Sequence, residues 1–239
     1  MNNLINSSSK LIVKPYACLQ ILRRGFWFID IPRTSSSSIW LEIGEHFGFP
    51  YGKKDISDKQ HPTNGSTNFF PSHMTAQEAR SNFGNFIWST IFTFTIVRNP
   101  WDRIYSLYLF RKKRQRIENN VSFRDYVISL QEAIVSNKLP TSLFSYPPHL
   151  YGSADFILDE DGEIMVDCVV KYENRNSELK FVASRLGIPE LGKLHVQGTS
   201  HNKAAEHYSE AYDLEMKEIV ATIYAKDIDL FNYQFGGEA

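Results

Sequence analysis

The residues best suited to chemistry lie in two short segments, and the first is an arginine followed by a run of residues with hydroxyl side chains. This run consists of Arg33, Thr34, Ser35, Ser36, Ser37 and Ser38. It lies between an apolar stretch and a helical pattern, so backbone N–H groups at the helix start point toward one spot, where the helix dipole adds positive charge. Arg33 adds a full charge in the planar fork that suits phosphate or sulfate oxygens. The segment predicts an anion-binding turn, although an ordinary serine-rich helix cap explains the same serines.

The second segment begins with Arg98 and ends with Ser106. Between them, Asn99, Pro100 and Asp102 are the N-cap, the first-turn proline and the first-turn acid typical of a helix start. Arg98 follows the most strand-like stretch of the chain, and ligands of open α/β sheets bind beyond the carboxyl ends of strands. Helix capping does not account for Arg98 and Ser106, so these two residues are candidate ligands of an anion.

Alternating strands and helices must position the two segments. Apolar, β-branched and aromatic runs predict strands at residues 26–31, 91–97 and 168–172. Helical spacing of apolar residues predicts helices at 39–47, 75–83, 100–111, 123–136, 179–186 and 216–224. Strands that alternate with helices form parallel βαβ units, so the predicted fold class is α/β, with a central, mainly parallel β-sheet flanked by helices.

The connections between these elements carry two further expectations. The Asp161-Gly162 turn, flanked by apolar residues at 156–158 and 163–166, predicts a hairpin. Residues 53–73 and 137–153 are punctuated by prolines and predict long loops, which in compact domains are usually functional or disordered.

Together, the two segments resemble the sulfotransferase family that uses 3′-phosphoadenosine 5′-phosphosulfate (PAPS). In that family, the motif P-[KR]-T-x-x-[ST]-[ST] holds the 5′-phosphosulfate, and R-N-P-x-D-R-x-x-S holds the 3′-phosphate through its first and last residues. The resemblance assigns the first role to residues 33–38 and the second to Arg98 and Ser106. It is closest to the carbohydrate branch, such as heparan sulfate 2-O- and chondroitin 4-O-sulfotransferases, and to bacterial relatives. It implies a P-loop-like nucleotide-binding sulfotransferase fold.

The resemblance also implies catalytic roles. His73 lies between the two segments, where the family has its catalytic His or Glu, and an imidazole titrates near neutral pH, where general bases work best. Arg33 is expected to stabilise charge on the leaving phosphate, and Lys203 is a weaker candidate ligand of the cofactor. No metal is expected, because Arg33, the loop amides and the helix dipole already supply positive potential.

Two positions depart from the residues most common in the family. Arg33 stands where many relatives carry lysine, and either cation stabilises the leaving phosphate, but arginine does not readily give up a proton. Ser35 stands where glycine is common, and a serine argues against a positive-φ backbone at that position.

Composition limits the remaining possibilities. The 239 residues include 26 basic and 27 acidic ones, for a net charge of −1, which disfavours nucleic acid as a partner. The basic run 111–116 is either a docking face for an acidic glycan or a solvated helix end. Cys18 and Cys168 are too few for a disulfide framework. No apolar run reaches the roughly 18 residues of a membrane span and no signal peptide is recognisable, so the expected location is cytoplasmic.

These observations combine into one expected function and two alternatives. Residues 1–25 are expected to be an N-terminal extension and residues 26–239 a single sulfotransferase domain. The expected reaction moves a sulfuryl group from PAPS to a hydroxyl of an acceptor, a glycan or glycoconjugate, by in-line displacement. A nucleotide or small-molecule kinase is one alternative, although the chain lacks the G-x-x-x-x-G-K-[ST] loop. A non-catalytic nucleotide- or glycan-binding module is the other.

Overall fold

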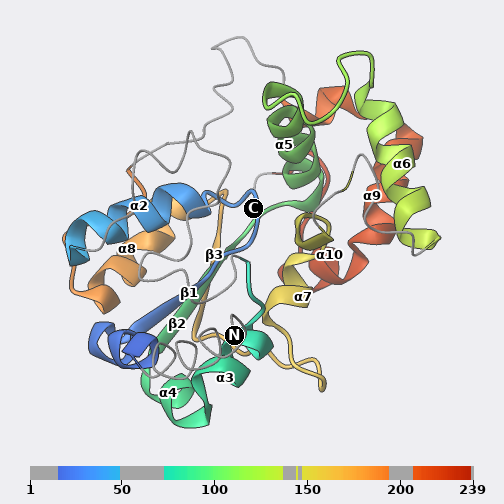
Figure 1. Ribbon diagram of the computed structural model, residues 1–239. Coiled ribbons are helices and arrows are strands. Elements are labelled where there is room, and N and C mark those ends of the chain that lie inside the picture. Colours follow the sequence, from blue (N-terminus) through green and yellow to red (C-terminus); the bar gives the residue numbers. More distant parts are fainter. Residues whose placement is uncertain (1–15, 49–72, 137–143, 145–146, 194–206, 238–239) are drawn as a thin grey trace, which may run out of the picture.

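The computed structural model describes residues 16–48, 73–136, 144, 147–193 and 207–237. Its centre is a sheet of parallel strands in the order β1 (Phe26–Ile29), β2 (Phe92–Val97) and β3 (Cys168–Lys171). In the register of the sheet, Phe94 of β2 pairs with Phe28 on one side and with Cys168 on the other. The parallel sheet and its flanking helices confirm the predicted α/β fold class (Figure 1).

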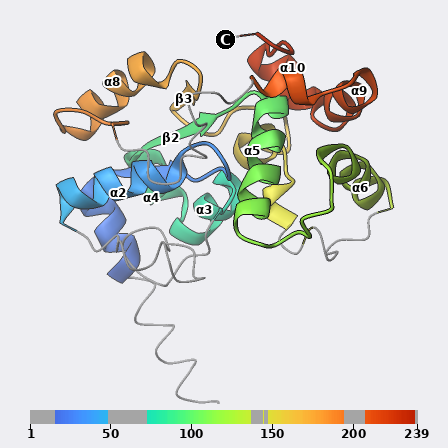
Figure 2. The ribbon, with the colours of Figure 1, turned by 90° about the horizontal axis from the view of Figure 1, so that it is seen from above.

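Helices cover both faces of the sheet. The helices are α2 (Ser36–Phe47), α3 (Ala76–Phe83), α4 (Asn85–Thr90), α5 (Pro100–Lys113), α6 (Phe123–Val135), α7 (Ser153–Ile157), α8 (Arg175–Leu186), α9 (Leu214–Ile223) and α10 (Ala225–Phe231), with 3₁₀ turns η1 (Pro147–His149) and η2 (Tyr208–Ala211). Figures 1 and 2 show α2 and α8 on one side of the sheet and α5, α6 and α9 on the other. A further helical stretch, residues 16–24, precedes β1.

Alternate side chains of the strands enter two separate cores. Phe28 of β1 packs in the smaller core with Trp40 of α2 and Val182 of α8, whereas Trp27 and Ile29 face the larger core on the opposite side. Every residue of β1 and β2 is buried. A parallel sheet covered on both faces requires such continuous burial, which explains why these strands are near-continuous apolar runs in the sequence.

Most helix boundaries follow the local signals in the sequence. Asn99 caps α5 by accepting the backbone N–H of Trp101 at 3.2 Å, and Pro100 is the first helical residue. Gly48 and Gly187 end α2 and α8 in the left-handed conformation that favours glycine. These caps confirm the predicted start of α5 and the predicted ends of α2 and α8.

The predicted hairpin is wrong over its first strand. The residues before the turn form α7, and a single antiparallel bridge between Leu158 and Ile164 is the pairing that the structure describes. The buried Asp227 carboxylate accepts the backbone N–H groups of Ser153 at 2.6 Å and Ala154 at 2.8 Å. A carboxylate on these N–H groups stabilises a helix start, and it comes from α10, far along the chain, where no local pattern reveals it.

The packed structure begins before residue 26. Ala17 and Ile21, in the helical stretch ahead of β1, are fully buried in the larger core. Residues 53–72 and most of 137–153, where long loops were expected, lie outside the described residues. Among the described residues, no helix has both the length and the apolar character needed to cross a membrane.

Candidate active site

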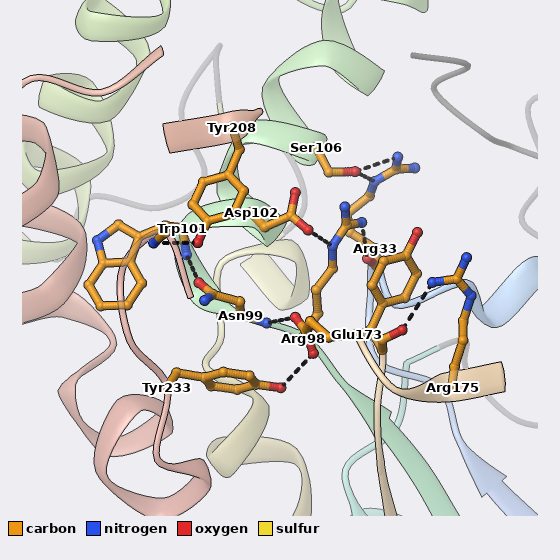
Figure 3. Close-up of polar contacts among 12 residues, drawn as sticks. Arg33, Arg98, Asn99, Trp101, Asp102, Ser106, Glu173, Arg175, Tyr208 and Tyr233 are labelled. Atoms are coloured by element: carbon orange, nitrogen blue, oxygen red, sulfur yellow. Dashed lines mark hydrogen bonds and ion pairs between the residues drawn. The ribbon is translucent and has the colours of Figure 1, made fainter. Parts of the chain in front are cut away.

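The carboxyl ends of the three strands place the predicted site residues at one edge of the sheet. Asp30 follows β1, Arg98 follows β2 and Tyr172 follows β3. Parallel strands all end at the same edge, so residues far apart in the sequence meet there, where ligands of α/β sheets bind. Figure 3 shows Arg33, Arg98 and the side chains around them as one polar cluster.

The turn after β1 has a strained backbone. Arg33 and Ser35 have φ values of 69° and 71°, in the left-handed region that residues other than glycine rarely adopt. Thr34 Oγ1 donates to the Ile31 carbonyl at 2.8 Å, and Arg98 Nη1 donates to the Arg33 carbonyl at 3.1 Å. The expectation that a serine at position 35 would avoid positive φ is therefore wrong, because these bonds from inside and outside the turn outweigh the local preference.

The serines of the turn form the start of α2. Ser35 is the N-cap residue, but its side chain makes no capping hydrogen bond. Ser36, Ser37 and Ser38 form the first helical turn, and the Ser38 N–H donates to the Ser35 carbonyl at 2.9 Å. The N–H groups of Ser36 and Ser37 thus precede the first hydrogen bond of the helix. Such groups and the helix dipole favour an anion at this position.

Arg33 reaches from this turn to α5. Its Nε and Nη2 atoms donate to Ser106 Oγ at 3.2 Å and 2.8 Å, and its guanidinium lies 4.5 Å from the Phe110 ring centre. Burial and the nearby charge of Arg98 lower the pKa of Arg33 to about 9. A lowered pKa means that the surroundings do not compensate the positive charge. Arg33 is therefore placed to gain from a bound anion.

Arg98, in contrast, is compensated within the fold. It is buried, its Nε donates to Asp102 Oδ2 at 2.7 Å, and its guanidinium lies 4.1 Å from the Tyr172 ring centre. Burial lowers the pKa of Arg98, but Asp102 and Tyr172 raise it by more, so the net shift is upward. The ion pair fixes the side chain against the Arg33 carbonyl.

Glu173 and the C-terminal segment hold the start of α5. The Glu173 carboxylate accepts the backbone N–H of Asn99 at 2.7 Å and the hydroxyl of Tyr233 at 3.4 Å (Figure 3). The Asn99 side chain donates to the Gln234 carbonyl at 2.9 Å. Burial raises the pKa of Glu173. Glu173 therefore orients the residue next to Arg98.

His73 contacts a different carboxylate at the end of β1. Its Nδ1 atom lies 2.9 Å from the carbonyl oxygen of Asp30 and 3.3 Å from the Asp30 carboxylate. Burial lowers the pKa of His73, but Asp30 raises it by more, so the pKa lies above its ordinary value. Sequence reasoning missed Asp30 because it reads as the polar end of a strand, and nothing local connects it to a histidine 43 positions later.

The C-terminal end of α5 brings two more arginines to Phe110. The guanidinium groups of Arg114 and Arg116 each lie 5.7 Å from the ring centre, which Arg33 also contacts. Gln115, between them, has a φ of 52°, and the backbone closes the helix in the Schellman pattern that usually takes glycine. The chain therefore turns at the end of α5, and the exposed Arg114 and Arg116 side chains lie beside Phe110.

The structure thus unites most of the predicted residues. Arg33, Arg98 and Ser106 meet through direct hydrogen bonds, with the first turn of α2 continuing from Arg33. His73 contacts Asp30, which follows β1 and precedes the turn that carries Arg33. Lys203 lies outside the described residues, so its role stays a prediction.

Comparison with known proteins identifies the family. The model of a protein family described as "Sulfotransferase family" matches residues 44–234, which are most of the chain. The chain belongs to the sulfotransferase family. The match begins within α2 and includes His73, Arg98 and Ser106, whereas the turn at residues 33–38 lies before it. Family membership supports sulfuryl transfer in general terms and leaves the acceptor open.

Two individual proteins are similar to this sulfotransferase. An uncharacterized protein of Archaeoglobus fulgidus is 26% identical over 119 residues, which cover 49% of this chain and 85% of that protein. A sulfotransferase from Alicyclobacillus acidocaldarius, known from a crystal structure, is 15% identical, with 89% of this chain and 87% of that chain covered at a TM-score of 0.39. At that TM-score the likeness carries no weight for the fold, which rests on the strand pairing described above.

Proposed function

We propose that this sulfotransferase moves a sulfuryl group from PAPS to a hydroxyl of an acceptor. The observation that carries the proposal is the direct meeting of two anion-binding segments 73 positions apart. Arg33 donates to Ser106, and Arg98 donates to the Arg33 carbonyl. One cluster built from two segments supports a ligand with two separate anionic groups, which PAPS has at its 3′ and 5′ positions.

The side chains present fit such a donor. The lowered pKa of Arg33 shows an uncompensated charge, and no ion pair joins Arg33 to a carboxylate within the residues that the structure describes. We propose that residues 33–38, which are the turn after β1 and the first turn of α2, bind the 5′ end, and that Arg98 and Ser106 bind the 3′-phosphate. Lys203 is proposed as a further ligand. When bound, PAPS supplies the sulfuryl group and a bisphosphate leaving group.

His73 is proposed as the general base. Asp30 lies against its Nδ1 atom, which leaves Nε2 to take the proton of the acceptor hydroxyl as that oxygen attacks the sulfur. Arg33 and the N–H groups of α2 stabilise the negative charge that develops on the leaving phosphate oxygen. Arg33 acts here as a fixed charge, because a guanidinium does not readily give up its proton.

We propose a glycan or glycoconjugate that carries anionic groups as the acceptor. Support comes from Arg114 and Arg116, which lie around Phe110 beside Arg33. Guanidinium groups pair with carboxylates and sulfates in two-pronged geometry, so these arginines are suited to an acidic acceptor bound next to the donor. A cytoplasmic location stays a prediction from the sequence.

The test is transfer of radiolabelled sulfate from PAPS to a panel of acidic oligosaccharides, neutral oligosaccharides and simple alcohols. We expect labelled sulfate esters and release of the 3′,5′-bisphosphate, with acidic oligosaccharides the best acceptors. His73→Ala is expected to abolish transfer while it leaves bisphosphate affinity nearly intact. Phosphoryl transfer from labelled ATP, without transfer from PAPS, would show a kinase. Tight bisphosphate binding without transfer to any acceptor would show a non-catalytic module.

A further inference from the structure

Three titratable side chains from separate segments, one of them His73 itself, meet at the carboxyl edge of the sheet. Asp30 follows β1, His73 precedes α3, and His149 is the last residue of η1. All three are buried, with exposures of 6%, 7% and 4%. The rings of His73 and His149 meet edge to face, with centres 5.8 Å apart and planes at 64°. Asp30 and His149 are thus the titratable groups that face His73 from the described elements packed against it.

The contacts of Asp30 determine which ring nitrogen of His73 carries the proton. Nδ1 lies 2.9 Å from the Asp30 carbonyl oxygen, which only accepts hydrogen bonds, and 3.3 Å from the Asp30 carboxylate, which also accepts when ionised. A neutral imidazole has one N–H and one lone pair. With two acceptors at Nδ1, the N–H belongs there and the lone pair belongs on Nε2.

The backbone supports a functional role for this pair. His73 has a φ of 59°, in the left-handed region, and a buried carboxylate is costly unless a partner compensates it. Packing alone requires neither feature, because an apolar side chain would fill the same space without the cost. A strained residue held against a buried acid is typical of a catalytic site.

We propose that Asp30 is the positioning residue of His73. Its carbonyl and carboxylate keep the proton on Nδ1, direct the Nε2 lone pair toward the acceptor hydroxyl, and stabilise the imidazolium that forms. In the step, the acceptor O–H bond breaks, its proton moves to Nε2, the acceptor oxygen bonds to sulfur, and the bond from sulfur to the phosphate oxygen breaks. The catalytic part of this inference rests on the proposed function, whereas the state of the imidazole does not.

The first experiment is ¹⁵N NMR of the histidine rings across a pH titration, with the His73 signals assigned by comparison with His73→Gln. We expect the Nδ1–H form in the neutral ring of the unsubstituted protein. In Asp30→Asn, we expect the same form, which the backbone carbonyl retains, and a His73 pKa lower by about one pH unit or more. Asp102→Asn, the same change in the first turn of α5, is the control and is expected to leave the His73 signals unchanged.

Two results would overturn the inference without any activity measurement. One is an Nε2–H form of the neutral His73 ring in the unsubstituted protein. The other is an unchanged His73 pKa in a folded Asp30→Asn protein. Either outcome leaves the proposed sulfuryl transfer untouched, so the two proposals fail separately.

The second experiment separates positioning from packing through kinetics. Asp30→Asn is expected to lower kcat by about 100-fold or more while the KM for PAPS changes little, and Asp30→Glu is expected to recover part of the loss. Because Asp30 raises the His73 pKa, the rising limb of the pH–rate profile is expected to move to lower pH in Asp30→Asn. A higher KM for PAPS, without a change in kcat or in the pH–rate profile, would contradict the positioning role.

Discussion

The turn after β1 and the turn after β2 both place an arginine at the same edge of the sheet, but in opposite electrostatic states. Arg98 is buried, with the Asp102 carboxylate at 2.7 Å and the Tyr172 ring beneath it, and its pKa is raised. Arg33 contacts a hydroxyl and an aromatic ring, and its pKa is lowered. The fold therefore compensates the charge of Arg98 more fully than that of Arg33.

This difference indicates a division of labour. Arg98 is part of the frame, because its guanidinium holds the Arg33 carbonyl and its own ion pair anchors it to α5. Arg33 stands on a strained backbone, and its guanidinium contacts Ser106 and Phe110 and no carboxylate among the described residues. Loss of Arg98 should thus affect stability and binding together, whereas loss of Arg33 should affect chemistry above all.

The largest expected effect is that of Arg33→Ala on turnover. We expect kcat/KM for sulfuryl transfer to fall about a thousandfold, because a charge that stabilises the leaving phosphate is removed, with little change in the free energy of unfolding. Steady-state kinetics and urea unfolding measure the two quantities. Arg33→Lys is the matched control and should recover part of the activity. Equal losses of stability and activity would remove the contrast with Arg98.

Arg98→Ala is expected to act on the fold as well as on the site. It leaves the Asp102 carboxylate without its partner, so the free energy of unfolding should fall by about 3 kcal/mol, and the bisphosphate should bind much more weakly. Urea unfolding and calorimetric titration with the bisphosphate check this. An Arg98→Ala variant with an unchanged free energy of unfolding and weaker bisphosphate binding would mean that Arg98, like Arg33, contributes little to stability.

Arg116→Ala tests whether the positively charged surface around Arg33 continues to the end of α5. We expect roughly tenfold weaker binding of an oligogalacturonate, measured with the bisphosphate present, because a charged contact is lost. Lys113 is exposed, as Arg116 is, but it is Arg116 whose guanidinium lies over Phe110, so Lys113→Ala removes the same charge and should have a much smaller effect. Equal effects of the two substitutions would indicate a diffuse basic surface and not a defined site.

The smallest expected effect concerns the strained turn itself. Ser35→Gly should raise the free energy of unfolding by about 1 kcal/mol, because glycine adopts a φ of 71° without steric cost. Urea unfolding measures the change, and Ser37→Gly, within the first turn of α2, should be destabilising. A loss of stability in Ser35→Gly would show that the serine side chain, and not the surrounding hydrogen bonds, maintains the turn.

Local signals predicted the elements well where the decisive contacts are local. The start of α5 depends on Asn99 and Pro100 themselves, and β2 is an uninterrupted β-branched and aromatic run. The start of α7 depends instead on Asp227, and α10 was not predicted at all, because its residues carry no clear apolar stripe. The prediction at α7 failed because a carboxylate from a remote helix supplies the hydrogen bonds at its start.

The amino-acid sequence alone is enough to point to the groups that this sulfotransferase has for anion chemistry and to the strands that precede Arg33 and Arg98. Residue type, capping and periodicity are local properties, so Arg33, Arg98 and Ser106 stood out without a structure. Contacts between distant segments are needed to know that the charge of Arg98 is compensated more fully than that of Arg33, and that Asp30 faces His73. The physical reason is that charge compensation and proton position depend on neighbours within a few ångströms, and parallel strands take those neighbours from distant parts of the chain.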